Sequence, residues 1–290
     1  MALMKTLILI LSLAFTSVTA LAQYGYRTAY GLTALSASGG MAPPPVAGYT
    51  MWLTTRDATT MFTNLAHTVQ AVPNNATGGR VAWWKDKSLV ANGTNNVFSS
   101  SEGTARPQLT NSPALNNLNA LRYITSDQNN LLSSNTLLST PVSSSITVLV
   151  AGIMQAPGQP YGSLFTWGGG ASGEMRFRRN NTADQMELYH DPSDLISGNI
   201  NTNQGYIFSF RINNTANTME IWTNLVVSAS GADSGNMPAS SKVGVGWMDN
   251  AGGNQFYWSG YIAEVLVYPS ALSNTDMTNS INYLKTLYIP

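Results

Sequence analysis

Alternation of apolar and polar residues is the feature that most constrains how this chain folds. In one run, Phe208, Phe210 and Ile212 alternate with Ser209 and Arg211. Successive side chains of a β-strand point to opposite faces, so this period of two predicts a half-buried strand. Similar short runs, bounded by Asn, Gly, Ser or Pro, occupy residues 146–150, 219–224 and 243–247. Several strands in series with no helical pattern between them predict an all-β fold, an antiparallel two-sheet sandwich.

One helix is predicted at the end of the chain. Ser273 and Asp276 lie three residues apart, where their side-chain oxygens can accept hydrogen bonds from the free backbone N–H groups of a helix start. Four apolar residues then recur at helical spacing, namely Met277, Ile281, Leu284 and Tyr288. We expect this short C-terminal helix to pack on the sandwich and close the domain.

The first residues match a secretory signal peptide. A basic start that includes Lys5 precedes an apolar run from Leu7 to Phe15, and small residues end in Ala20-Leu21-Ala22. A membrane anchor is the alternative, but the apolar run is shorter than the roughly 20 residues that a bilayer span needs. We predict a signal peptide over residues 1–22, a Gly/Pro-rich arm or linker over 23–48 and a sandwich over 49–290. The mature chain would be secreted or held at the cell surface, with passage through the periplasm and no membrane insertion.

The low and balanced charge of the chain argues against two classes of binding partner. Charged residues make up 10% of the chain and the formal net charge is zero, against a typical charged fraction near 25%. Nucleic acids and anionic lipids attract basic surfaces, so neither is expected as a partner. The chain has no cysteine, so no disulfide stabilises it, and a domain of this length can bury enough core without one.

The C-terminal segment Trp258–Ser273 carries a family resemblance. Its aromatic-x-Gly-x-Ile-Ala-Glu-Val strand and Ala-Leu-Ser turn, followed by a helix, resemble the laminin-G-like branch of the concanavalin A-like lectin/glucanase superfamily. Earlier segments match in order: Tyr49–Asp57, Trp84–Ser88, Arg106–Leu109 and Asn119–Tyr123. The Gly-Asn-Gly that usually follows the second of these segments is replaced here by residues 89–93. The resemblance implies a two-sheet jelly roll, shared by lectins, glycan hydrolases, adhesion modules and viral appendages, so it does not fix the function.

No catalytic constellation stands out. Hydrolases of this superfamily carry a Glu-x-Asp-x-x-Glu strand that sets two carboxylates about 5 Å apart, and this sequence has no such triplet. The odd spacing of Asp184 and Glu187 puts them on opposite faces of a strand. The two histidines, His67 and His190, are scattered, and no Gly-x-Ser-x-Gly nucleophile turn is present. We therefore predict no catalytic residues and a protein that is not an enzyme.

Glu264 is a carboxylate in an otherwise apolar strand. Sequence parity places it on the face of Ile262, Leu266 and Tyr268. A buried carboxylate needs a partner. The resemblance implies a basic residue before Ala-Leu-Ser, where this chain has Ser270. Either another arginine or hydroxyl groups compensate, or Glu264 is partly solvated, and a structural role is favoured.

Ligand-binding residues are predicted from aromatic and amide groups, because sugars stack on aromatic rings and exchange hydrogen bonds with amides. Trp222 lies opposite the core-facing positions of its strand, whereas Trp247 and Trp167 each lead into a polar or Gly-rich loop. Core packing is the alternative for each of them. The predicted carbohydrate-binding residues are Trp222, Trp247, Asn250, Asn254 and Trp167, with Trp83 as a weaker fourth tryptophan.

Calcium is the one cofactor that the sequence suggests. The acidic loops at Asp191, Asp194 and Asp249 could contribute to its six to eight oxygen ligands, although neither loop has a diagnostic spacing. Zinc is not expected with two scattered histidines and no thiols.

Two hypotheses of function follow. The first is a secreted or surface-exposed carbohydrate-binding or adhesion domain, whose partner is a glycan or cell-surface polysaccharide. The second is a structural or appendage protein, including a phage or virion surface component, that forms a homo-oligomer or larger assembly. Glycan binding discriminates in favour of the first hypothesis, and a stable oligomer in favour of the second.

Overall fold

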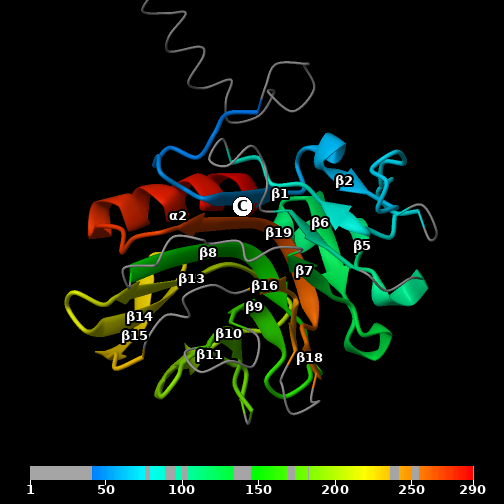
Figure 1. The fold of residues 1–290 in the computed structure, drawn as a ribbon. Helices are drawn as coiled ribbons and strands as arrows, with labels where there is room; N and C mark the ends of the chain where they lie inside the picture. Colours follow the sequence, from blue (N-terminus) through cyan, green and yellow to red (C-terminus); the bar gives the residue numbers. More distant parts are fainter. Residues whose placement is uncertain are drawn as a thin grey trace, which may run out of the picture. The chain divides into compact units, whose positions relative to one another are not determined.

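The computed structural model describes residues 41–75, 79–88, 96–99, 103–133, 145–168, 174–181, 183–235, 242–249 and 255–289. Pro44–Pro290 form one compact unit, which Figure 1 shows as two stacked sheets with one C-terminal helix. The unit includes the last residues of the predicted arm, since Tyr268 Oη donates a hydrogen bond to Val46 O. None of the helices in these ranges combines the length and apolarity of a bilayer-crossing segment.

Sheet A holds the long strands of the molecule. Its pairings are antiparallel, and its strands run in the order β15 (Val226–Ala232), β14 (Thr218–Thr223), β13 (Gly205–Asn213), β8 (Ser145–Met154), β19 (Gly260–Tyr268), β6 (Leu118–Tyr123) and β5 (Gln108–Ser112), with β1 (Met51–Thr54) also paired to β19. Phe208, Phe210 and Ile212 face the core, as their alternation predicts.

Sheet B is built from shorter strands. Its order is β12 (Ser193–Asn199), β11 (Gln185–His190), β10 (Met175–Arg179), β9 (Ser163–Trp167), β16 (Val243–Val245), β7 (Leu131–Ser133), β4 (Val97–Phe98), β3 (Trp83–Trp84) and β2 (Met61–Phe62). The hairpin of β17 (Trp247–Asp249) and β18 (Gln255–Tyr257) attaches through a parallel contact between β18 and β9. Short 3-10 turns occupy Ala58–Thr60, Gly103–Ala105, Pro113–Leu115 and Thr125–Asp127.

The predicted helix is α2 (Asn274–Tyr288). Ser273 caps it by accepting a hydrogen bond from the Asp276 N–H at 3.1 Å, and the four residues of the predicted stripe are all buried. The helix packs against β8 and β13 of sheet A, on the face turned away from sheet B (Figure 1). The antiparallel sandwich with a short C-terminal helix is therefore confirmed.

A β-bulge corrects the expected neighbours of Glu264. The pairing of β19 with β8 shifts register between Ile262 and Glu264. The extra residue reverses parity, so Ile262 joins the core between the sheets with Val265. Glu264 is left on the opposite face of sheet A, under α2.

Candidate functional site

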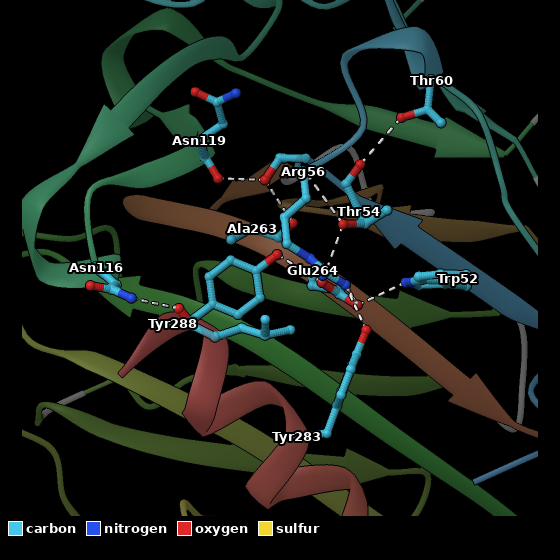
Figure 2. A network of polar contacts seen from close by, with 12 residues as sticks. Trp52, Thr54, Arg56, Thr60, Asn116, Asn119, Ala263, Glu264, Tyr283 and Tyr288 are labelled. Carbon is cyan, nitrogen blue, oxygen red and sulfur yellow. Dashed lines mark hydrogen bonds and ion pairs between the residues drawn. The ribbon is translucent and has the colours of Figure 1, made fainter. Parts of the chain in front are cut away.

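Glu264 is a fully buried charged group whose two carboxylate oxygens both accept hydrogen bonds. Figure 2 shows side chains from β1, β19 and α2 converging on its carboxylate. Oε1 accepts from Trp52 Nε1 at 2.7 Å, and Oε2 accepts from Tyr288 Oη at 2.7 Å and Thr54 Oγ1 at 3.2 Å. Arg56 Nε lies 3.1 Å from Oε2. Of the alternatives open from sequence, an arginine together with hydroxyl groups compensates this carboxylate.

The same cluster explains the state of Arg56. Burial by itself lowers the pKa of this guanidinium, but the adjacent Glu264 carboxylate, together with Tyr288 and Tyr283, outweighs it and the net pKa is raised. Arg56 Nη2 also donates to Tyr283 Oη at 2.6 Å. Burial raises the pKa of Tyr288 well above its usual value, so its hydroxyl stays a donor at neutral pH. The cluster joins α2 to sheet A, and its role is structural.

The three tryptophans favoured from sequence are buried, at 0% exposure for Trp167, 6% for Trp222 and 9% for Trp247. Trp167 belongs to the core between the sheets, so its ring has no face open to a sugar. Trp222 lies on the outer face of sheet A, where its Nε1 donates to Glu220 at 2.8 Å and the Arg211 guanidinium lies 5.9 Å from its ring.

The amides of the proposed loop site cannot be placed. Asn250 and Asn254 lie outside the described residues. Trp247 begins β17, whose partner strand β18 closes the far side of that loop. The binding roles of these residues and of Trp222 stay predictions.

Trp83 is the one tryptophan of the seven that is not buried. It pairs across strands with Phe62 on one side and Phe98 on the other. Its ring stacks with Phe98 at 5.6 Å between centroids, and the exposed His67 ring lies 3.9 Å from it. Since Trp84 beside it is a core residue, these side chains point away from the core. Phe62, His67, Trp83 and Phe98 form what we call the aromatic patch.

The aromatic patch begins a row of outward-facing positions that crosses the whole of sheet B. The strand registers place in line Phe62, Trp83, Phe98, Leu132, Gly244, Thr166, Arg176, Tyr189 and Asp194. The row starts with aromatic side chains and ends with charged ones. The sequences of β12 and of the two-residue strands at the aromatic end show no clear alternation of apolar and polar residues. The row is therefore visible only from the strand pairing in the structure.

Arg176 of the row and Arg178, two residues further along β10, both stack on tyrosine rings. Arg178 lies 4.3 Å from the Tyr161 ring and 5.3 Å from the Tyr189 ring, and Arg176 also lies 5.3 Å from Tyr189. Arg178 Nε donates to Glu187 Oε1 at 2.8 Å. We call Tyr161, Arg176, Arg178, Glu187 and Tyr189 the charged patch.

Glu187 is the carboxylic acid of this patch. Burial raises its pKa, and the hydrogen bonds from Arg178 and Asn180 only partly oppose this rise. Asn180 Nδ2 donates to Oε2 at 3.0 Å, so both oxygens of the carboxylate accept hydrogen bonds. Asp184, its neighbour in sequence, pairs with Arg179 instead, at 2.6 Å.

The β17–β18 hairpin divides the row. A Cβ on Gly244 would lie 2.5 Å from the carbonyl oxygen of Trp247, and Thr166 Oγ1 donates to that same oxygen at 3.1 Å. The backbone of Trp247 therefore crosses the outer face at the middle of the row, where only glycine leaves room. Phe256 on β18 contacts Tyr161, so the hairpin also borders the charged patch.

Metal ligands do not gather in the described part of the chain. No group of three or more His, Cys, Asp or Glu side chains there could hold an ion. Asp191 accepts from Tyr189 Oη at 3.0 Å, and Asp194 pairs with Tyr189 across strands. Asp249 ends β17, and its side chain is outside the described set. Calcium binding stays a prediction.

The two histidines occupy unlike places. His190 is fully buried, and its Nδ1 lies 2.9 Å from Asp233 Oδ1. His67 is exposed beside Trp83. Neither lies against a serine or threonine hydroxyl in any contact of the described residues, so neither forms a nucleophile–base pair there.

No protein-family model matches the sequence, and a search of curated proteins gives no match either. Among solved structures, a Trypanosoma rangeli sialidase in complex with the inhibitor DANA matches 91% of this chain and 38% of its own, at 9% identity and a TM-score of 0.51. Domain 4 of an extracellular arabinanase from Geobacillus stearothermophilus, in complex with arabinotriose, covers 63% of this chain and 84% of its own at 15% identity, with a TM-score of 0.48. The sialidase match supports the sandwich fold alone, over about a third of that enzyme, and the laminin-G-like assignment stays a prediction.

Proposed function

We propose that this protein binds carbohydrate on the outer face of sheet B, as a secreted or surface-exposed binding or adhesion domain. The observation that carries the proposal is the aromatic patch, in which Trp83 is partly exposed beside Phe62 and Phe98. Aromatic rings favour the C–H faces of sugars. The neutral, Asn- and Ser-rich chain offers no strong field to recruit a charged macromolecule instead.

Binding without catalysis is part of this proposal. A glycosidase of the retaining type places two carboxyl groups about 5 Å apart, one of them free to attack the sugar. On this face Glu187 is engaged by Arg178 and Asn180. Asp184, which precedes β11, is engaged by Arg179. These partners favour a role for the carboxylates in positioning side chains.

The test is ligand-dependent thermal melting against a glycan panel, with and without calcium, followed by calorimetric titration of the hits. Binding to the native state must raise the melting temperature. We expect Trp83→Ala to weaken binding by about tenfold, the loss of one aromatic contact worth about 1.4 kcal/mol. Trp222→Ala is the matched control on sheet A and should retain the wild-type affinity.

Two outcomes would count against this assignment. If Trp222→Ala or Trp247→Ala abolished binding while Trp83→Ala did not, the site would lie at the residues predicted from sequence. If no glycan shifted the melting temperature under either calcium condition, carbohydrate binding itself would be rejected.

A second candidate function, assembly through protein contacts, is favoured by a different surface. Val226 is 65% exposed, and the adjacent Leu225 and Val227 are also exposed. Val226 and Val227 begin β15, an edge strand of sheet A with no charged residue, and Leu225 directly precedes it. Uncharged, exposed edge strands are templates for association. Light scattering that gives a stable oligomer, disrupted by Val226→Lys, would support this function, and a strict monomer would argue against it.

A further inference from the structure

The aromatic and charged patches lie on one row, and the number of strands between them fixes the distance that separates them. From Trp83 on β3 to Arg176 on β10 the row passes through β4, β7, β16 and β9, which makes five strand-to-strand steps. At about 4.8 Å for each step, the two side chains are about 24 Å apart along the face. A mono- or disaccharide cannot touch both.

The two patches offer different chemistry. The aromatic patch offers rings, whereas the charged patch offers N–H donors, since its carboxylate Glu187 is buried with both oxygens already bonded to Arg178 and Asn180. Arg176 Nε is buried and has no hydrogen-bond partner in the described part of the chain. A buried donor without a partner is costly, and an acceptor oxygen from a ligand would relieve that cost.

The charge of the second patch indicates what kind of acceptor it takes. Arg178 is paired with Glu187 and Arg176 with Glu174, so two positive charges meet two negative ones. A patch of balanced charge favours neutral groups that both donate and accept, and sugar hydroxyls do both. A strongly anionic ligand would also face Asp194, which pairs with Tyr189 at the end of the row.

We propose that these patches are two subsites for one linear, hydroxyl-rich polysaccharide, which passes over the Trp247 backbone between them. This inference rests on the proposed carbohydrate binding. Because the hairpin at Gly244 interrupts the row, each subsite binds its own short stretch of the chain. An oligosaccharide that reaches about 24 Å is the shortest that occupies both.

The predicted signature is a step in affinity with chain length. Once an oligosaccharide bound at the first subsite is long enough to reach the second, its second contact forms within the same complex. The overall affinity then exceeds that of either subsite alone. Calorimetric titration with cello-, xylo-, arabino- and chito-oligosaccharides of two to eight units measures this. For the series that binds, we expect a rise of at least tenfold between the shorter and the longer oligomers.

Variants at the two ends separate the subsites. Trp83→Ala and Arg176→Gln should each remove the step, leaving the longer oligomers no tighter than the short ones. Arg178→Lys keeps a positive charge beside Glu187 and should reduce the step as well. Arg211→Gln is the matched control, because Arg211 forms a similar pair with Glu220 at 2.7 Å on sheet A, and it should leave the step intact.

The outcomes distinguish the two proposals. Binding with no dependence on length, or a step that survives Arg176→Gln and Arg178→Lys in folded protein, overturns the two-subsite inference and leaves carbohydrate binding standing. Absence of binding to every oligomer overturns both proposals. Circular dichroism and thermal melting of each variant confirm that the fold is retained before affinities are compared.

Discussion

The outer faces of the two sheets carry the same residue types in different surroundings. On sheet A, Glu264 and Arg56 lie under α2, and tyrosine, threonine and tryptophan donors saturate the carboxylate. On sheet B, Glu187 and Arg178 form a similar pair, but no helix of the described residues packs over it. Both pairs are buried, so the contrast lies in what covers them: the helix α2 over Glu264, and the rings of Tyr161 and Tyr189 beside Arg178.

The strongest test of this contrast is removal of the covered charge. Glu264→Gln leaves Arg56 buried without a counter-charge, and breaking a buried pair in this way costs about 3–5 kcal/mol. We expect the free energy of unfolding, measured by urea denaturation, to fall by that amount. Glu187→Gln should cost less, because burial already disfavours the charged form of Glu187 and Arg178 keeps its stacking on Tyr161 and Tyr189. Equal losses in the two variants would show that the faces do not differ as described.

Tryptophan substitutions sharpen the same contrast. Trp222 is 6% exposed, and truncation of a buried tryptophan costs about 3 kcal/mol or more. Trp83 is partly exposed, so Trp83→Ala should lower the unfolding free energy by only about 1 kcal/mol. Denaturant titration of the two variants checks this order. A larger loss for Trp83→Ala would make it a packing residue and weaken its assignment to a ligand site.

The sequence predicted more of the fold than of the site. Strand alternation and the capping pair Ser273 and Asp276 gave the sandwich and its helix, because these signals are local. The requirement that a buried Glu264 have a partner was also sound, although the partner, Arg56, lies 208 residues away. Its predicted face relation to Ile262 was wrong, because a bulge has no clear sequence signal here.

The candidate site was harder to predict because parity gives the face of a strand but not what covers that face. Trp222 was correctly placed opposite the core, yet sheet A buries it there. Trp83 was the weaker candidate from sequence; the structure leaves it partly exposed, and its role in binding stays a prediction. It could not be ranked first, because its partners Phe62 and Phe98 come from distant segments.

The smallest expected effect concerns pH and Glu187. Burial raises the pKa of this carboxyl above its unfolded value near 4.5, so the folded state favours the neutral form. The stabilisation this gives is fully present below the unfolded pKa and is lost as the pH rises through the folded pKa. Glu187→Gln is neutral throughout, so its melting temperature relative to wild type should increase from pH 4 to pH 7. A relative melting temperature that stays constant or falls over this range would mean that Arg178 fully offsets the effect of burial on Glu187.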